Sequence, residues 1–182
     1  MKSLLFVILI TLFSIPALAQ DISESHLQAS EELLVQMNMP EFLTESIDEI
    51  VDMQTGEGSA MAAFEDIVRS FMHENLSWNN LKDAFVQIYA EEFTEAELLE
   101  IIAFYKTEAG IKFRRSNEVD LTEEERIELT RFLETETGAK VNSLVPISYE
   151  KVAAVFDQVL NETLPELERR MKERMLELDE SL

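Results

Sequence analysis

The two histidines, His26 and His73, are the side chains best suited to metal or proton-transfer chemistry. His73 and Glu74 begin the H-E-x-x-H pattern of zinc proteases, but Ser77 stands where the second histidine must be. The segment from Asp52 to Gly56 lacks the regular oxygen ligands of a calcium loop. We therefore expect no metal site, and we interpret both histidines as surface or capping residues.

The other common catalytic patterns also fail. Gly56 and Gly58 begin a G-x-G-x-x-G phosphate loop, but Met61 occupies its last position and no strand is predicted before it. The chain has no cysteine, which excludes a thiol nucleophile, and no G-x-S-x-G elbow. Its 37 acidic residues could supply a glycosidase-like carboxylate pair at almost any spacing by chance. We expect that the protein has no catalytic residue, binds no cofactor and is not an enzyme. A carboxylate-dependent hydrolase is the least favoured alternative.

Aromatic side chains are concentrated in one central stretch of the chain. They are Trp78, Phe85, Tyr89, Phe93, Phe104 and Tyr105. One interpretation is a groove between helices that holds an apolar ligand. The other is an ordinary aromatic core, which the helical spacing of these residues favours.

The formal net charge of −22 restricts the range of partners. Nucleic acid and anionic lipid headgroups both require Lys and Arg to neutralise phosphate, so the acidic surface repels them. We expect a well-solvated acidic exterior and no nucleic-acid partner.

Apolar residues recur at helical spacing along nearly the whole chain, and strand patterns are absent. The spacing predicts helices over residues 25–37, 40–53, 61–72 and 78–89, with Ser77 as a cap for the last. Gly56 and Gly58 mark a loop. With only four glycines and four prolines, the chain is predicted to be an all-α bundle without a sheet.

A repeated pattern follows, in residues 93–113 and again 28 positions later in residues 121–141. Nine of the 21 aligned positions are identical, among them the core aromatic pair Phe104 and Phe132. Thr94 and Glu97 form a capping-box pattern, which predicts the start of a largely apolar, central helix. Each copy ends in a Thr-Glu-x-Gly break, where the threonine can cap a new helix. We interpret the two stretches as a duplicated helix–turn–helix unit.

Beyond the second copy, Val152, Val155, Phe156 and Val159 form one more apolar stripe. Residues 163–166, Thr-Leu-Pro-Glu, are typical of a helix cap with proline in the first turn, and predict a C-terminal helix at about 163–180. One face of that helix is apolar, formed by Leu164, Leu167, Met171, Met175 and Leu178. It could be the seam of a homo-oligomer or could pack on its own domain.

The first 19 residues have the organisation of a secretory signal peptide. Lys2 is followed by an apolar run, and Ala17-Leu18-Ala19 is the small-x-small pattern before a cleavage site. The run is shorter than the ~20 residues that span a bilayer. We expect cleavage after Ala19, leaving residues 20–182 as one helical domain with no membrane span and no cysteine for a lipid anchor.

Three stretches resemble a family of exported bacterial proteins known as domain of unknown function 2059. They are residues 30–43, residues 75–113 and, more loosely, residues 138–146. The most specific part is Tyr-Ala-x-x-Phe-Thr-x-x-Glu-Leu at 89–98, followed by Phe-Tyr-Lys-Thr-x-x-Gly at 104–110. The resemblance implies a helical protein of the Gram-negative periplasm, and it implies no reaction and no functional residues.

We therefore expect a non-catalytic periplasmic module that binds a partner protein or supports the envelope. The alternative is a carrier of an apolar small molecule held among the aromatic helices.

Overall fold

The computed structural model describes residues 22–56, 58–114 and 120–180, and these contain eight α-helices, one 3-10 helix and no strand. The elements in chain order are α1 (Glu24–Gln36), α2 (Met39–Thr55), η1 (Ala62–Phe64), α3 (Glu65–Asn75), α4 (Trp78–Glu92), α5 (Glu95–Tyr105), α6 (Glu108–Arg114), α7 (Glu123–Leu133) and α8 (Glu136–Glu180). The all-α prediction is confirmed. The expected signal peptide, residues 1–19, lies outside the described residues.

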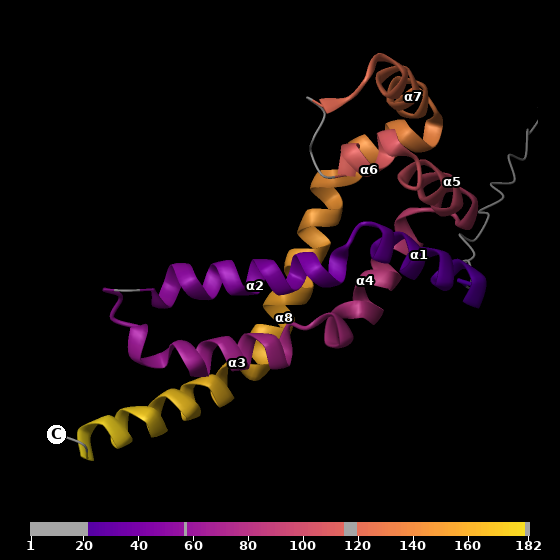
Figure 1. Ribbon diagram of the computed structural model, residues 1–182. Helices are drawn as coiled ribbons and strands as arrows, with labels where there is room; N and C mark the ends of the chain where they lie inside the picture. The colour runs from indigo at the N-terminus through magenta and orange to yellow at the C-terminus, as the bar shows by residue number, and fades with distance from the viewer. Residues whose placement is uncertain (1–21, 57, 115–119, 181–182) are drawn as a thin grey trace, which may run out of the picture.

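The long helix α8 connects the two ends of the molecule (Figure 1). Helices α5, α6 and α7 gather around its beginning, whereas α2 and α3 lie side by side at the other end. With a rise of about 1.5 Å per residue, the 45 residues of α8 extend roughly 68 Å. The later turns of α8 pack on α4 and α3, so α8 contacts helices that are distant from it in the sequence.

Two clusters of buried side chains form the core, and α1 lies between them. Leu33 of α1 belongs to the cluster built on α5, which also holds Phe104 and Phe132. The adjacent Leu34 belongs to the cluster built on α2 and α4. Consecutive helical residues point about 100° apart, so one helix can serve two cores.

The capping box predicted at Thr94 is present, and so is its equivalent in the second copy at Thr122. The backbone N–H of Thr94 donates to Glu97 Oε2 at 2.7 Å, and that of Thr122 donates to Glu125 Oε2 at 2.6 Å. Ser77 has the extended backbone of an N-cap, but its side chain makes no capping hydrogen bond. The predicted helix over residues 61–72 is divided into η1 and α3.

The two Thr-Glu-x-Gly breaks have the same local geometry. Thr107 Oγ1 accepts from the Gly110 N–H at 3.1 Å, and Thr135 Oγ1 accepts from the Gly138 N–H at 3.0 Å. A Cβ on either glycine would lie 2.0 Å from a carbonyl oxygen of the preceding helix, that of Phe104 or Phe132 respectively. Only glycine permits this close turn. The predicted capping by both threonines is confirmed, while the origin of the two units by duplication stays a prediction.

The prediction of a separate helix beginning at Thr163 is wrong. Helix α8 runs without a break from Glu136 to Glu180. The Thr163 hydroxyl donates to the Val159 carbonyl at 2.7 Å, as inside a helix, and does not cap a new one. Because Val155 and Phe156 before this point and Arg170 after it contact other helices, tertiary packing keeps the helix continuous through Pro165.

Candidate functional site

The six aromatic residues lie in the two clusters of buried side chains. Phe85, Phe93, Phe104 and Tyr105 are buried, while Trp78 and Tyr89 are partly buried and pack against them. Their rings contact aromatic neighbours, with centroid separations of 6.5 Å for Trp78–Phe85 and 6.3 Å for Tyr89–Phe93. Burial, with a smaller contribution from Tyr105, raises the pKa of Tyr89 to about 12. These side chains fill space between helices.

One hollow, of about 650 Å³, adjoins this region where α1, α4, α5 and α8 meet. Phe93 is the one of the six aromatic residues that lines it, and its other lining residues are mostly polar or charged, including His26, Glu95 and Lys140. The Lys140 ammonium lies 5.2 Å from the centroid of the Phe93 ring. Ile22, Ala90 and Phe93 are its apolar lining residues.

Each histidine connects two helices. His26 Nε2 donates to the Phe93 carbonyl at 2.7 Å, joining α1 to the end of α4. His73 Nε2 lies 2.9 Å from Asp48 Oδ1, and Arg69 Nη1 donates to the same oxygen at 2.7 Å. The hydrogen bonds from His73 and Arg69 hold the pKa of the Asp48 carboxyl below its usual range, although partial burial opposes them. Within the described residues, no group of three or more His, Asp or Glu side chains is placed to hold a metal ion.

The apolar face predicted for the C-terminal helix is divided between packing and solvent. Leu167 and Met171 are partly buried, whereas Leu164, Met175 and Leu178 are exposed. Arg170 donates to Glu74 at 2.8 Å and Arg174 pairs with Asp66, so this part of α8 is bound to α3. Part of this face therefore packs within its own chain. A homo-oligomer formed through the exposed part stays a prediction.

Helix α2 carries the most exposed large apolar side chain of the described residues. Met53 is 79% exposed, Phe42 59% and Ile50 48%. Phe42 and Met53 lie on the side of α2 opposite its buried Leu43, Ile47, Val51 and Thr55. Ile50 lies between that side and Leu43, at the edge of the buried face. We call Phe42, Ile50 and Met53 the α2 stripe.

Apolar spacing did not predict the α2 stripe. It predicts a helix over residues 40–53, and within that helix the structure buries Leu43, Ile47 and Val51 but leaves the α2 stripe exposed. An available signal was the width of the apolar pattern, because six apolar residues in this helix exceed what one buried face needs.

Within the described residues, no helix combines the length and the hydropathy needed to cross a bilayer. The family model described as "Uncharacterized protein conserved in bacteria (DUF2059)" matches residues 79–117, which include all of α5 and α6 and all of α4 except its first residue. No curated protein and no solved structure matches the chain.

Proposed function

We propose that this chain, matched in its centre by an uncharacterized bacterial family, is an exported, non-catalytic module that binds a partner protein through the α2 stripe. The signal-peptide pattern of residues 1–19 supports export to the periplasm. The exposure of the α2 stripe is the observation that carries the binding proposal.

The α2 stripe differs from scattered apolar surface residues, which are normal in soluble proteins. Phe42, Ile50 and Met53 lie on one side of a single helix, within about three turns. Side chains at this spacing fit the apolar face of a partner helix.

Acidic residues along one edge of the stripe indicate the charge of the partner. Glu45, Glu49 and Asp52 are exposed at positions i, i+4 and i+7 of α2. Asp52 accepts from Arg69 at 2.5 Å, whereas Glu45 and Glu49 have no ion-pair partner among the described residues. The best complement is therefore an amphipathic helix with an apolar face and a row of Lys or Arg beside it.

The contacts of the two histidines support a non-catalytic role, because both side chains hold helices together. His73 and Asp48 join α3 to α2, and His26 joins α1 to α4. These contacts explain both histidines as structural.

The test uses the mature protein purified from periplasm, which should begin at Gln20, and a synthetic amphipathic helix of Leu and Lys as the probe. We expect the amide NMR shifts caused by the probe to lie on α2 around Phe42 and Met53. Replacing both residues by Asp should weaken the affinity at least about tenfold, the equivalent of about 1.4 kcal/mol. A probe with Glu in place of Lys should not bind.

The matched control is Leu99→Asp with Ile127→Asp, because these side chains are 50% and 51% exposed but lie outside the α2 stripe. This control should bind the probe like the unaltered protein. Shifts spread over the whole acidic surface, equal losses in both variants, or a stable homodimer joined through α2 would each contradict the proposal.

A further inference from the structure

Two ion pairs connect the two helix–turn–helix units, residues 93–113 and 121–141, and each unit supplies the lysine of one pair and the glutamate of the other. Lys112 Nζ donates to both carboxylate oxygens of Glu125, each at 2.8 Å. Lys140 Nζ donates to both carboxylate oxygens of Glu97, at 2.9 and 2.7 Å. Lys112 and Lys140 are equivalent in the 28-residue alignment, and so are Glu97 and Glu125. Each unit thus supplies a lysine to the capping box of the other, and exchanging the units leaves the pattern unchanged.

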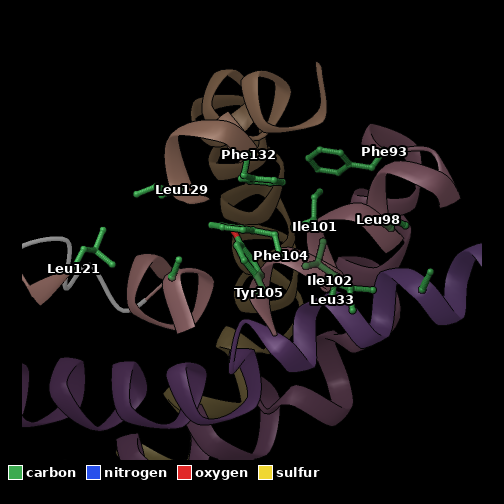
Figure 2. Packing of buried hydrophobic residues seen from close by; sticks show 12 residues of the cluster. Leu33, Phe93, Leu98, Ile101, Ile102, Phe104, Tyr105, Leu121, Leu129 and Phe132 are labelled. Carbon is green, nitrogen blue, oxygen red and sulfur yellow. The ribbon is translucent and has the colours of Figure 1, made fainter. Parts of the chain in front are cut away.

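The centre of this arrangement is a contact between two equivalent aromatic rings. Phe104 and Phe132 stack with centroids 4.0 Å apart and planes inclined by 8° (Figure 2). A residue that meets its own equivalent lies on or near a two-fold axis, as in the interface of a symmetric dimer. The helix packing agrees with such an axis, because α6 packs on α7 while α8 packs on α5.

The outer faces of the two units do not share this symmetry. Helix α1 covers α5, where Leu98 and Ile102 are buried with Leu33. The equivalents of Leu98 and Ile102 in α7 are Arg126 and Thr130, which line a shallow hollow of about 320 Å³.

The residues that form the two ion pairs and the ring contact are therefore identical in the two copies. Leu98 and Ile102, which pack with α1, have different residues at the equivalent positions of the second copy. Glu97, Phe104 and Lys112 have identical equivalents, as do the capping residues Thr94 and Thr107. Chance similarity between two acidic helices does not account for identity that coincides with a reciprocal contact.

We infer that residues 94–113 and 122–141 form an internal isologous pair, and that the face joining them fits a second copy of the same unit. One chain thus contains the interface that a chain with a single unit would form with another copy of itself. This inference goes beyond the proposed function, since it concerns the α5–α8 end of the molecule and not the α2 stripe.

The first test is made in the full chain with charge reversals. Lys112→Glu and Lys140→Glu should each lower the urea midpoint of unfolding. Glu125→Lys should recover part of the midpoint that Lys112→Glu loses, and Glu97→Lys part of the midpoint that Lys140→Glu loses. Recovery should be partial because a lysine cannot accept the capping hydrogen bond from Thr122 or Thr94. The crossed combinations, such as Lys112→Glu with Glu97→Lys, should not recover, because the lysine that replaces Glu97 would then face Lys140. Recovery in the crossed combinations, or no recovery in either set, would overturn the inference.

The second test removes residues 111–138, one full repeat of 28 positions, and joins Gly110 to Ala139. Glu97, Phe104 and Lys140 then belong to one unit, and sedimentation should give a homodimer. In this shortened chain Lys140→Glu and Glu97→Lys should each weaken the dimer at least tenfold, whereas mixing the two variants should give a heterodimer. A folded, helical monomer would overturn the inference, and if the shortened chain does not fold, the recovery pattern in the full chain decides.

Discussion

The carboxylate of Glu97 belongs to a helix cap and an ion pair at once. It accepts from the Thr94 N–H at 2.7 Å and from Lys140 at 2.7 Å. Partial burial acts to raise the pKa of Glu97, but the hydrogen bonds from Lys140 and Thr94 outweigh it and hold the pKa below its usual value of 4.5. A carboxyl group with a lower pKa in the folded state stabilises the fold above its unfolded pKa, and this contribution is lost as the pH falls through the folded pKa.

Glu97→Gln should therefore reduce stability most near neutral pH. The amide oxygen can still accept from Thr94, so the variant keeps the cap and loses the ion pair with Lys140. We expect it to be less stable by about 1 kcal/mol near pH 6, a difference that shrinks below about pH 4.5. Urea unfolding across this pH range is the measurement.

Glu124→Gln is the control, because it removes one negative charge from an exposed position on α7. Its stability should stay near that of the unaltered protein at every pH. A Glu97→Gln difference that is constant with pH would contradict an ionic contribution from Glu97.

Among the helices, α8 shows how tertiary contacts can override a local signal. Proline inside a helix lacks an N–H donor and clashes with the carbonyl of residue i−4, which normally costs about 3 kcal/mol. Pro165 stands inside α8, yet the helix continues because the turns on both sides of it are held by contacts with α4 and α3.

Pro165→Ala should consequently stabilise the protein, by about 2 kcal/mol after allowance for the greater freedom of the unfolded chain. If a helix began at this position instead, proline would already suit its first turn and alanine would bring no gain. Denaturant unfolding distinguishes the two outcomes.

Pro40→Ala provides the matched control, since Pro40 lies in the first turn of α2. This substitution should leave stability unchanged or lower it. An equal gain from both substitutions would contradict the assignment of Pro165 to a helix interior.

For the molecule as a whole, the dominant electrostatic quantity is the net charge of −22. Ion pairs such as Arg170–Glu74 bring some opposite charges together, but the excess of acid leaves the folded surface under self-repulsion. Unfolding separates these charges and relieves the repulsion.

Added salt should therefore stabilise the fold. Raising ionic strength from about 0.01 M to about 0.15 M shortens the Debye length from about 30 Å to about 8 Å and screens the repulsion. We expect the thermal midpoint to rise by a few degrees, given that about 1 kcal/mol corresponds to roughly 2–4 °C at this size. NaCl and choline chloride should act alike if screening is the cause, and a falling midpoint would show that screened ion pairs outweigh the repulsion.

Features that depend on local patterns could be predicted from the sequence. Apolar spacing places most of the helices, because the 3.6-residue period is a property of the helix itself. The capping boxes at Thr94 and Thr122 and the close turns at Gly110 and Gly138 were also predictable, because each depends on a few adjacent residues.

Which apolar residues stay exposed, and which units meet, depends on packing between elements that are distant in the sequence. Phe42 and Leu43 are adjacent and both apolar, yet Leu43 is buried and Phe42 is exposed, because the position of α3 selects the buried side of α2. The repeat could be aligned from sequence, but that Phe104 meets Phe132 and Lys112 meets Glu125 depends on how two distant helix pairs pack. Packing between elements sums many weak contacts that no local pattern contains.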